Sequence, residues 1–475
     1  MSNKCALIFA AWAMALMPGC ANYQPKPLSP NDNARALDSR SLDDPRLRQF
    51  VAVALSRDDR PEQPLRWRLT TLTLAALYYH PDIRVAWANL AGAEAAVITA
   101  REPANPVLNF TNILSSAAVA GAIPPAAAPV TIGPVIDFIL ETASKRESRT
   151  ARAQNLADAA RWDLATAEWR VRGGIRDALL ELWATRERLA LTGQRLALQE
   201  QLVELLEHRL AEGAASVLDV ARERIGRAQI VLALGDLDRR AAEARVKLAT
   251  AIGIPVRGLD RVDPDLSSFD APPALAAKPD GGEWRRKALT ERSDVRASLA
   301  AYDAAQAALR LAIAGRYPNV TLGIGYNYDL GVNRYVLDLG VTLPVFHQNQ
   351  GPIAEALARR QQAAAAFTAL QAQIISAIDQ AEAASRKATM EVAAGDAILA
   401  DERRRALRVE AAFRAGQQDR PTLLTARLEV ATIALSRFDA IVRQRQVLGA
   451  LEDAQQRPLY EPYAAPRLPD SELSP

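Results

Sequence analysis

The spacing of hydrophobic and polar positions changes in the same way in two long stretches of the chain. Residues 70–102 and 284–316 are rich in alanine, and their apolar positions recur at i, i+3 and i+4 with charges between them, which predicts amphipathic helices. Each stretch reaches a proline, Pro106 or Pro318, that cannot continue a helix, and beyond it the period falls to two. The pattern therefore predicts a helix followed by strands, twice.

The strand pattern predicts one hairpin in each stretch. Apolar residues hold the even positions from Val320 to Tyr328, and they alternate again from Tyr335 to Val345, so a hairpin with one apolar face is expected over 318–346. A matching hairpin is expected over 106–141. Because residues 103–136 carry no charge, a membrane-spanning helix is the alternative, but repeated prolines disfavour the roughly 20 unbroken helical residues it needs.

Long helical patterns follow both hairpins, over about 146–211 and 353–414, and a glycine-containing turn then leads to shorter helices over about 217–252 and 422–456. At 1.5 Å per residue the long runs reach on the order of 95 Å, and the two short helices of each stretch together nearly match that length. We therefore expect two short helices end to end beside each long one. Such a rod has hairpins at one end and helical turns at the other.

The two stretches are copies of one unit. Asp82-Ile83-Arg84 returns as Asp294-Val295-Arg296, and Pro106 returns as Pro318, both at a spacing of 212 residues. The expected organisation is a first repeat over 65–252, an equatorial linker over 253–283, a second repeat over 284–456 and a C-terminal tail over 457–475. Residues 20–64 are expected to form an extended tether.

The N-terminus has the pattern of a targeting segment. Lys4 precedes an uncharged apolar run over 5–17, which predicts a signal peptide over 1–19. The sequence Leu16-Met17-Pro18-Gly19-Cys20 resembles a bacterial lipobox, which implies that the thiol of Cys20 is lipidated. Ala21, which follows it, implies sorting to the outer membrane.

Composition and charge exclude several classes of function. The 58 Lys+Arg and 55 Asp+Glu residues leave a net charge of only +3, which disfavours nucleic acid as a partner. Both cysteines lie in the first twenty residues and the three histidines are far apart, so no metal site and no cofactor is expected. No nucleophile elbow or phosphate loop is present in the sequence, and we expect no enzyme.

Four strands are too few to close a barrel, since about eight are the working minimum, and an open sheet in lipid leaves unsatisfied edges. The chain is therefore expected to oligomerise. At this point residues 65–456 resemble the TolC-like outer-membrane efflux proteins. Residues 343–356, Leu-Pro-Val-Phe-His-Gln-Asn-Gln-Gly-Pro-Ile-Ala-Glu-Ala, are most similar to the heavy-metal cation-efflux branch of that family.

The resemblance implies a mainly α fold with a membrane β-barrel: a long α-helical periplasmic barrel and four β-strands per chain, completing a 12-stranded barrel as a homotrimer. It implies a passive duct that receives substrate, possibly heavy-metal cations, from a periplasmic adaptor (membrane fusion protein) and an inner-membrane pump of the resistance-nodulation-division type. The duct would sit in outer-membrane lipid. The alternatives are a drug or small-molecule duct of the same family, or a non-channel periplasmic scaffold.

The turns far from the hairpins also resemble the family. Residues 209–216 are similar to the tip motif that meets the adaptor, and the counterpart at 413–419 departs from it, with a two-residue insertion expected before Ala426. Nearby acidic side chains have two interpretations, a cation-attracting gate held shut by arginines or simple caps of the following helices. The expected adaptor-facing residues are Arg209, Leu210, Gly213, Ser216 and Gly416, and the expected gate residues are Asp219, Asp419 and Arg420.

Overall fold

The computed structural model describes residues 23–55, 65–114, 130–273, 281–329 and 332–461. The chain divides into two compact units, residues 1–40 and 41–475. The described part of the smaller unit contains α2 (Pro30–Asp38), whose N-terminus is capped by Ser29. The larger unit contains the sheet and the long helices.

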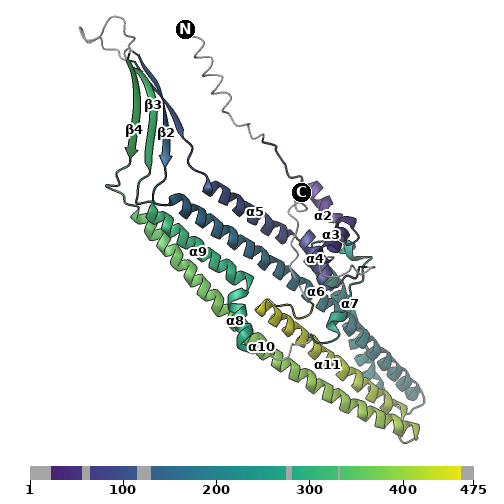
Figure 1. Cartoon of the computed structure of the whole chain (residues 1–475). Coiled ribbons are helices and arrows are strands. Elements are labelled where there is room, and N and C mark those ends of the chain that lie inside the picture. The colour runs from purple at the N-terminus through teal and green to yellow at the C-terminus, as the bar shows by residue number, and fades with distance from the viewer. Residues whose placement is uncertain (1–22, 56–64, 115–129, 274–280, 330–331, 462–475) are drawn as a thin grey trace. The chain divides into compact units, whose positions relative to one another are not determined.

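Four strands form one antiparallel sheet in the order β1-β2-β3-β4 (Figure 1). They are β1 (Val107–Leu114), β2 (Val130–Leu140), β3 (Val320–Asp329) and β4 (Val332–Val341). Both predicted hairpins are present, and the alternative of a membrane-spanning helix over 103–136 is wrong. Strands of different repeats, β2 and β3, pair in the middle, and β1 and β4 have no partner on their outer edges among the described residues.

Most of the described residues outside the sheet are helical, which confirms the mainly α fold class with four strands. The first repeat contains α5 (Pro81–Arg101), α6 (Lys145–Ala211) and α7 (Val217–Ile252), and the second contains α9 (Ser293–Ala314), α10 (Gln350–Arg414) and α11 (Arg420–Gln455). Short helices of 21 and 36 residues pack along the 67 residues of α6, and helices of 22 and 36 residues pack along the 65 of α10. No helix in the described ranges is both long and apolar enough to cross a membrane.

The short helices meet end to end in both repeats. Gly253 ends α7 at a φ of 87°, so close to the start of α5 that an added Cβ would lie 2.9 Å from the His80 Cα. Only glycine fits such a position. In the second repeat Gln456 ends α11 at a φ of 46°, and its Oε1 accepts the backbone N–H of Ser293 at the start of α9 at 2.8 Å. We call each of these meeting points a joint.

The helices expected over 70–102 and 284–316 are interrupted at the joints, which corrects the prediction. In the first repeat α4 (Leu69–Tyr79) ends before Pro81, whose ring disfavours helix at the residue before it. In the second repeat α8 (Gly281–Glu291) ends at Arg292, whose guanidinium donates to the carbonyls of Asp453 and Ala454 at the end of α11. A helix C-terminus leaves such carbonyls unpaired, so this contact with a distant segment favours the break.

Residues 20–64 are not an extended tether throughout. The helix α3 (Pro45–Leu55) buries Leu47, Phe50 and Val51 in the main hydrophobic core, and the Tyr79 hydroxyl donates to Asp44 at 2.9 Å. The i, i+3, i+4 spacing of the three buried residues is the helical signal that the tether interpretation overlooked. Residues 1–22 and 56–64 lie outside the described part of the chain.

The main core lies beside the first-repeat joint, and the linker between the repeats contributes to it. Two short 3-10 turns, η1 (Val256–Leu259) and η2 (Ser267–Phe269), place Leu259 and Phe269 in this core. Residues after α11 also return to the helices. Glu461 Oε2 accepts both the backbone N–H of Thr70, at 2.9 Å, and its hydroxyl, at 2.6 Å, and so caps α4.

Candidate functional site

Two turns of the same geometry close the ends of the long helices. After α6, Gly213 has a φ of 72°, and the N–H of Ala214 donates to the Arg209 carbonyl at 2.7 Å. After α10, Gly416 has the same φ, and the N–H of Gln417 donates to the Ala412 carbonyl at 2.8 Å. Both are Schellman endings, in which glycine adopts the left-handed conformation at no steric cost. The structure thus gives Gly213 and Gly416 equivalent positions.

The next helix starts at the same distance from both glycines. Ser216 is the N-cap of α7 and accepts the Leu218 N–H at 3.0 Å, and Asp419 is the N-cap of α11. Each N-cap follows its glycine by three residues, and α7 and α11 both have 36 residues. The expected two-residue insertion before Ala426 is therefore wrong. That expectation came from aligning an Ala-Arg pair inside each of the two helices. Aligning the glycines of the two turns leaves no insertion.

Asp419 has a helix cap and an ion pair at once. Its Oδ1 accepts the N–H of Thr422 at 3.1 Å and the Thr422 hydroxyl at 2.6 Å, and its Oδ2 lies 2.8 Å from Arg209 Nη1. The hydrogen bond from Thr422, followed by the one from Arg209, lowers the pKa of Asp419 below its ordinary value. The ion pair links the end of α6 to the start of α11. With side chains 36% and 45% exposed, such a pair contributes only about 0–1 kcal/mol.

Asp219 does not cap its helix, which corrects half of the capping interpretation. It stands in the first turn of α7, where Ser216 already holds the cap. Its carboxylate and the Arg420 guanidinium are exposed and make no hydrogen bond or ion pair with any residue that the structure describes. Of the expected gate residues, the structure therefore joins only Asp419 to an arginine, and that arginine is Arg209, not Arg420. Leu210 lies beside Arg209 in the last turn of α6.

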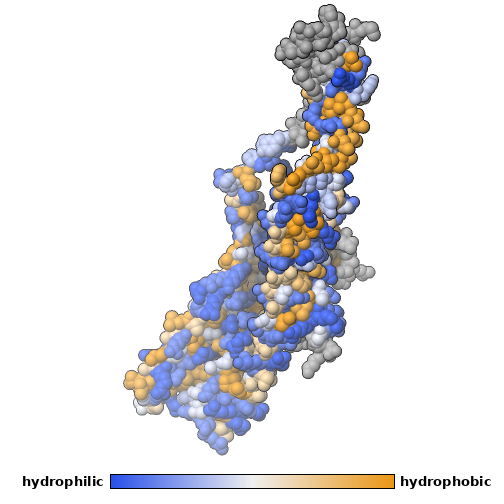
Figure 2. Space-filling model, turned by 90° about the vertical axis from the view of Figure 1, so that its left-hand side faces the viewer, coloured by the Kyte–Doolittle hydropathy of each residue, from blue (hydrophilic) through white to orange (hydrophobic). Residues whose placement is uncertain are grey.

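At the other end of the unit, one face of the sheet is apolar and exposed. Leu337 is 75% exposed and Leu339 is 67% exposed, and Figure 2 shows hydrophobic side chains gathering over the strands above a mostly hydrophilic helical part. Exposed apolar area of this extent indicates a contact with lipid or protein. The strand register aligns these side chains in rows across the sheet: Leu108, Ile136, Ile324 and Leu337; Phe138, Leu322 and Leu339; Leu140, Val320 and Val341.

The opposite face is closely packed and mixed, with valines and Arg334 beside glycines and carboxylates. Asp137, Gly323 and Asp338 are neighbours in one register row of β2, β3 and β4. An added Cβ at Gly323 would lie 2.7 Å from Asp137 Oδ1, so the glycine leaves room for the carboxylate, and Asn109 Nδ2 donates to Asp137 Oδ2 at 2.5 Å. The sheet thus separates a lipophilic face from one that carries carboxylates.

The three histidines lie apart. His80 caps α5 by accepting the Asp82 N–H on Nδ1 at 3.2 Å, and burial lowers its pKa. His347 Nδ1 accepts the Asn349 N–H at 3.2 Å, and His208 lies in the last turn of α6. Within the described ranges no group of three or more His, Cys, Asp or Glu residues is arranged to hold a metal ion.

Comparisons with known proteins find one family model and several relatives that match parts of the chain. The profile of the "Outer membrane efflux protein" family matches residues 73–254, from α4 to the end of α7. The pyoverdine export outer membrane protein OpmQ of Pseudomonas aeruginosa is 26% identical over 331 residues, covering 64% of this chain and 67% of the relative. Over this stretch the chain is similar to outer membrane efflux proteins. The cobalt-zinc-cadmium resistance protein CzcC of Cupriavidus metallidurans is 24% identical over 226 residues, which is 47% of this chain and 52% of the relative.

Solved structures of outer-membrane channels share the fold. The outer membrane protein VceC of Vibrio cholerae matches with a TM-score of 0.66 at 20% identity, over 82% of this chain and 95% of that one. CusC matches with a TM-score of 0.66 at 16% identity, over 82% and 91%. The outer-membrane channel OprN matches with a TM-score of 0.66 at 19% identity, over 94% of this chain and the whole of that one.

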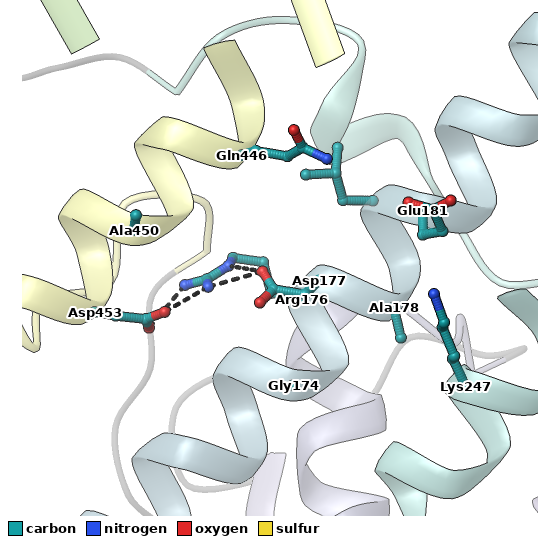
Figure 3. A pocket seen from close by; sticks show the side chains of 10 residues that line it. Gly174, Arg176, Asp177, Ala178, Glu181, Lys247, Gln446, Ala450 and Asp453 are labelled. Carbon is teal, nitrogen blue, oxygen red and sulfur yellow. Dashed lines mark hydrogen bonds and ion pairs between the residues drawn. The ribbon is translucent and has the colours of Figure 1, made fainter. Parts of the chain in front are cut away.

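The chain also contains a buried ion network near the second joint that sequence reasoning missed. Arg172 pairs with Glu452, which is fully buried, and Arg176 lies 3.5 Å from Glu452 and 2.7 Å from Asp453. Figure 3 shows the Arg176 guanidinium between Asp453 and Asp177 at the edge of a pocket of about 480 Å³. Burial raises the pKa of Glu452 despite the two arginines beside it. The network ties the middle of α6 to the end of α11.

A second buried carboxylate, Glu168 on α6, has no partner among the described residues. Glu168 is 8% exposed and makes no hydrogen bond or ion pair with a described residue. Burial raises the pKa of Glu168 to about 7. A single acidic residue in a helical pattern gives no sign of such burial in the sequence, because α6 is packed on several sides and its hydrophobic stripe is weak.

Proposed function

We propose that this protein is the outer-membrane duct of a tripartite efflux system, through which a substrate passes without chemical change. The single observation that carries the proposal is the four-stranded sheet, with an exposed apolar face, an opposite face that carries carboxylates and two unpaired edges on a long helical body. Similarity to outer membrane efflux proteins supports this cellular setting.

Closure by several copies follows from the strand count. A chain with four strands has half of the roughly eight that a closed barrel needs, and each unpaired edge exposes backbone groups that lipid cannot satisfy. Three copies supply twelve strands, and the homotrimer is our proposal for the assembly. In it the apolar rows face lipid and the row with Asp137 and Asp338 faces the lumen.

The helical turns are the proposed contact with the partners. Arg209, Leu210, Gly213, Ser216 and Gly416 lie at the end of the helices far from the strands, where a periplasmic adaptor would meet the duct. An inner-membrane pump of the resistance-nodulation-division type would supply the energy through that adaptor. Asp219, Asp419 and Arg420 are the proposed gate residues, and the pair between Arg209 and Asp419 would hold the tip in its resting state.

The names of the relatives point to different substances, pyoverdine export for one and cobalt, zinc and cadmium resistance for the other. The carboxylates of Asp137 and Asp338 favour cations in the lumen, since rings of acidic side chains attract them. We therefore propose heavy-metal cations as substrate, with small organic molecules as the alternative. A strain lacking this protein would become sensitive to cobalt, zinc or cadmium under the first proposal, and to organic compounds with unchanged metal tolerance under the second.

Lipid attachment at Cys20 is a further part of the proposal, and that residue lies outside the described ranges. Labelled palmitate should enter the wild-type protein and should be missing from Cys20→Ser. Equal labelling of both proteins would contradict lipid attachment.

The duct itself is tested by planar-bilayer recording with the purified full-length protein. A water-filled pore should give discrete conductance steps that prefer cations, and Asp137→Asn with Asp338→Asn should weaken that preference while the steps remain. The matched control is Asp236→Asn on the exposed surface of α7. A protein that assembles into membranes but never conducts would contradict the proposal.

A further inference from the structure

The connection from β4 to α10 exposes apolar side chains that nothing in the described chain covers. Phe346 is 99% exposed, and Leu343 and Val345 are 75% and 68% exposed. A phenylalanine without contacts on any side indicates a missing partner. The segment follows an edge strand, so its missing neighbour is whatever pairs with β4.

The corresponding connection of the first repeat, from β2 to α6, is covered within the chain where the two repeats meet. The residues that leave β2 contact the residues that lead into β3. Thr142 Oγ1 donates to the Pro318 carbonyl at 2.7 Å, and Lys145 Nζ donates to the Tyr317 carbonyl and to Asn319 Oδ1, both at 2.5 Å. We call this contact the internal seam.

The two repeats build the start of their long helices alike. The residue before α6, Ser144, has a φ of 54°, and the residue before α10, Asn349, has a φ of 63°. In both repeats, a side chain that follows the second strand of the hairpin donates to an equivalent carbonyl of the preceding helix. Arg149 Nε donates to the Ala100 carbonyl at 3.1 Å, and Asn349 Nδ2 donates to the carbonyl of Ala312, 212 residues further on, at 2.5 Å.

This equivalence assigns counterparts to both sides of the internal seam. Counted from the two residues with positive φ, His347 corresponds to Thr142 and Gln350 to Lys145. Counted by the repeat spacing, Pro106 corresponds to Pro318 and Asn105 to Tyr317. Within one chain His347 and Pro106 belong to opposite edges of the sheet, so they can meet only between copies.

The helices give the same result independently. They follow the order of the strands, with α5 packed on α6, α6 on α9 and α9 on α10. The contact between α6 and α9 accompanies the internal seam, and α10 and α5 are left at the two ends of the row. Their uncovered sides carry exposed aliphatic residues, Val85 and Ile98 on α5 and Leu357 on α10.

We propose that residues 346–350 of one copy pack on residues 105–107 of the next copy, as a repetition of the internal seam. This rests on the proposed closed ring of copies and names its contact. His347 Nδ1 accepts the Asn349 N–H, so the neutral ring carries its proton on Nε2 and donates it to the Pro106 carbonyl of the next copy. Gln350 Oε1 accepts the Gln348 N–H, so its amide NH₂ donates to the Asn105 carbonyl.

The contact has a consequence for assembly. A shift of one residue between paired strands turns every side chain to the other face, and no turn connects β4 to the β1 of another copy to prevent it. Side-chain bonds next to Pro106 fix the register at the end of the ladder, and Phe346 is covered at the same time.

Disulfide crosslinking tests the proposal in the full-length protein. Phe346→Cys combined with Asn105→Cys should give crosslinked dimers and trimers on oxidation in membranes. Each single variant controls for crosslinks to the N-terminal cysteines. Thr142→Cys with Tyr317→Cys is the positive control, because it should close within one chain at the internal seam and leave the apparent mass unchanged.

A variant measures the hydrogen bond. His347→Ala should lower the temperature at which the oligomer dissociates in detergent, and Gln348→Ala, which loses no side-chain bond, should leave it unchanged. An equal drop in both variants would contradict the role of His347.

Lipid is the rival neighbour of Phe346. In the Phe346→Trp variant, brominated phospholipids should not quench the tryptophan fluorescence if the neighbouring copy covers this residue. Strong quenching together with missing crosslinks would overturn the inference. If the copies still assemble and conduct without that crosslink, this inference fails and the duct remains. If no oligomer forms at all, the proposed function fails as well.

Discussion

The ionisation of Glu168 should destabilise this protein as the pH rises through neutrality. Its carboxylate is 8% exposed and unpaired among the described residues, and burial raises its pKa from 4.5 to about 7. A raised pKa means that the folded state binds the proton more tightly than the unfolded state. The stabilisation is complete below the unfolded value and is lost as the pH rises through 7.

The size of the effect follows from the shift. One pKa unit corresponds to about 1.4 kcal/mol, so the rise of the Glu168 pKa from 4.5 to about 7 amounts to about 3 kcal/mol between the two ends of this pH range. Glu168→Gln keeps the shape of the side chain and removes the ionisation. The variant should therefore resemble the wild type near pH 4 and exceed its free energy of unfolding by about 3 kcal/mol near pH 8.

Denaturant unfolding of the full-length protein in detergent, followed by circular dichroism at several pH values, measures this difference. Other groups titrate in the same range, so the informative quantity is the difference between variant and wild type at each pH. Glu355→Gln is the matched control, since Glu355 is 70% exposed on α10. Parallel curves for Glu168→Gln and wild type would refute the reasoning.

Three further predictions concern other parts of the molecule. Glu452→Gln removes the buried negative charge that pairs with Arg172, and it should lower the free energy of unfolding by about 3 kcal/mol or more. A loss as small as that of Glu355→Gln would contradict a buried network. Ile324→Arg places a cation on the apolar face at a cost of about 2–4 kcal/mol and should reduce the membrane-inserted fraction, while Thr321→Arg on the opposite face should be tolerated; equal losses would argue against a lipid-facing sheet. Asp419→Asn retains a good helix cap but loses the charge that pairs with Arg209. Multivalent cations should therefore block the conductance less strongly, while the thermal stability stays the same. Unchanged blockade would mean that Asp419 acts only as a helix cap.

Local patterns in the sequence were enough to predict the elements on which the function depends. The change of period at Pro106 and Pro318 indicated both hairpins, and the structure has strands there. The glycines at 213 and 416 marked the ends of the long helices, because only glycine adopts the required left-handed conformation without strain. These signals lie within a few residues of the feature that they predict.

The features that could not be predicted from the sequence depend on residues that are far apart in the chain. The break at Arg292 is favoured by the carbonyls of Asp453 and Ala454, more than 150 residues away, and no local pattern encodes it. The ion network joins Arg172 to Glu452 across 280 residues, and each member alone resembles an ordinary charge on a helix surface. The break before Pro81 had a local signal, which a long alanine-rich pattern obscured.

The joints at Gly253 and Gln456 have a mechanical consequence. At each joint two short helices stop, but a single long helix, α6 or α10, runs past the same level without interruption. A force or torque applied at the turns is therefore transmitted past the joint by the hydrogen-bonded backbone of the long helices. The two short helices can bend relative to each other without breaking these hydrogen bonds. The helical body is therefore stiff along the long helices and can bend at the joints.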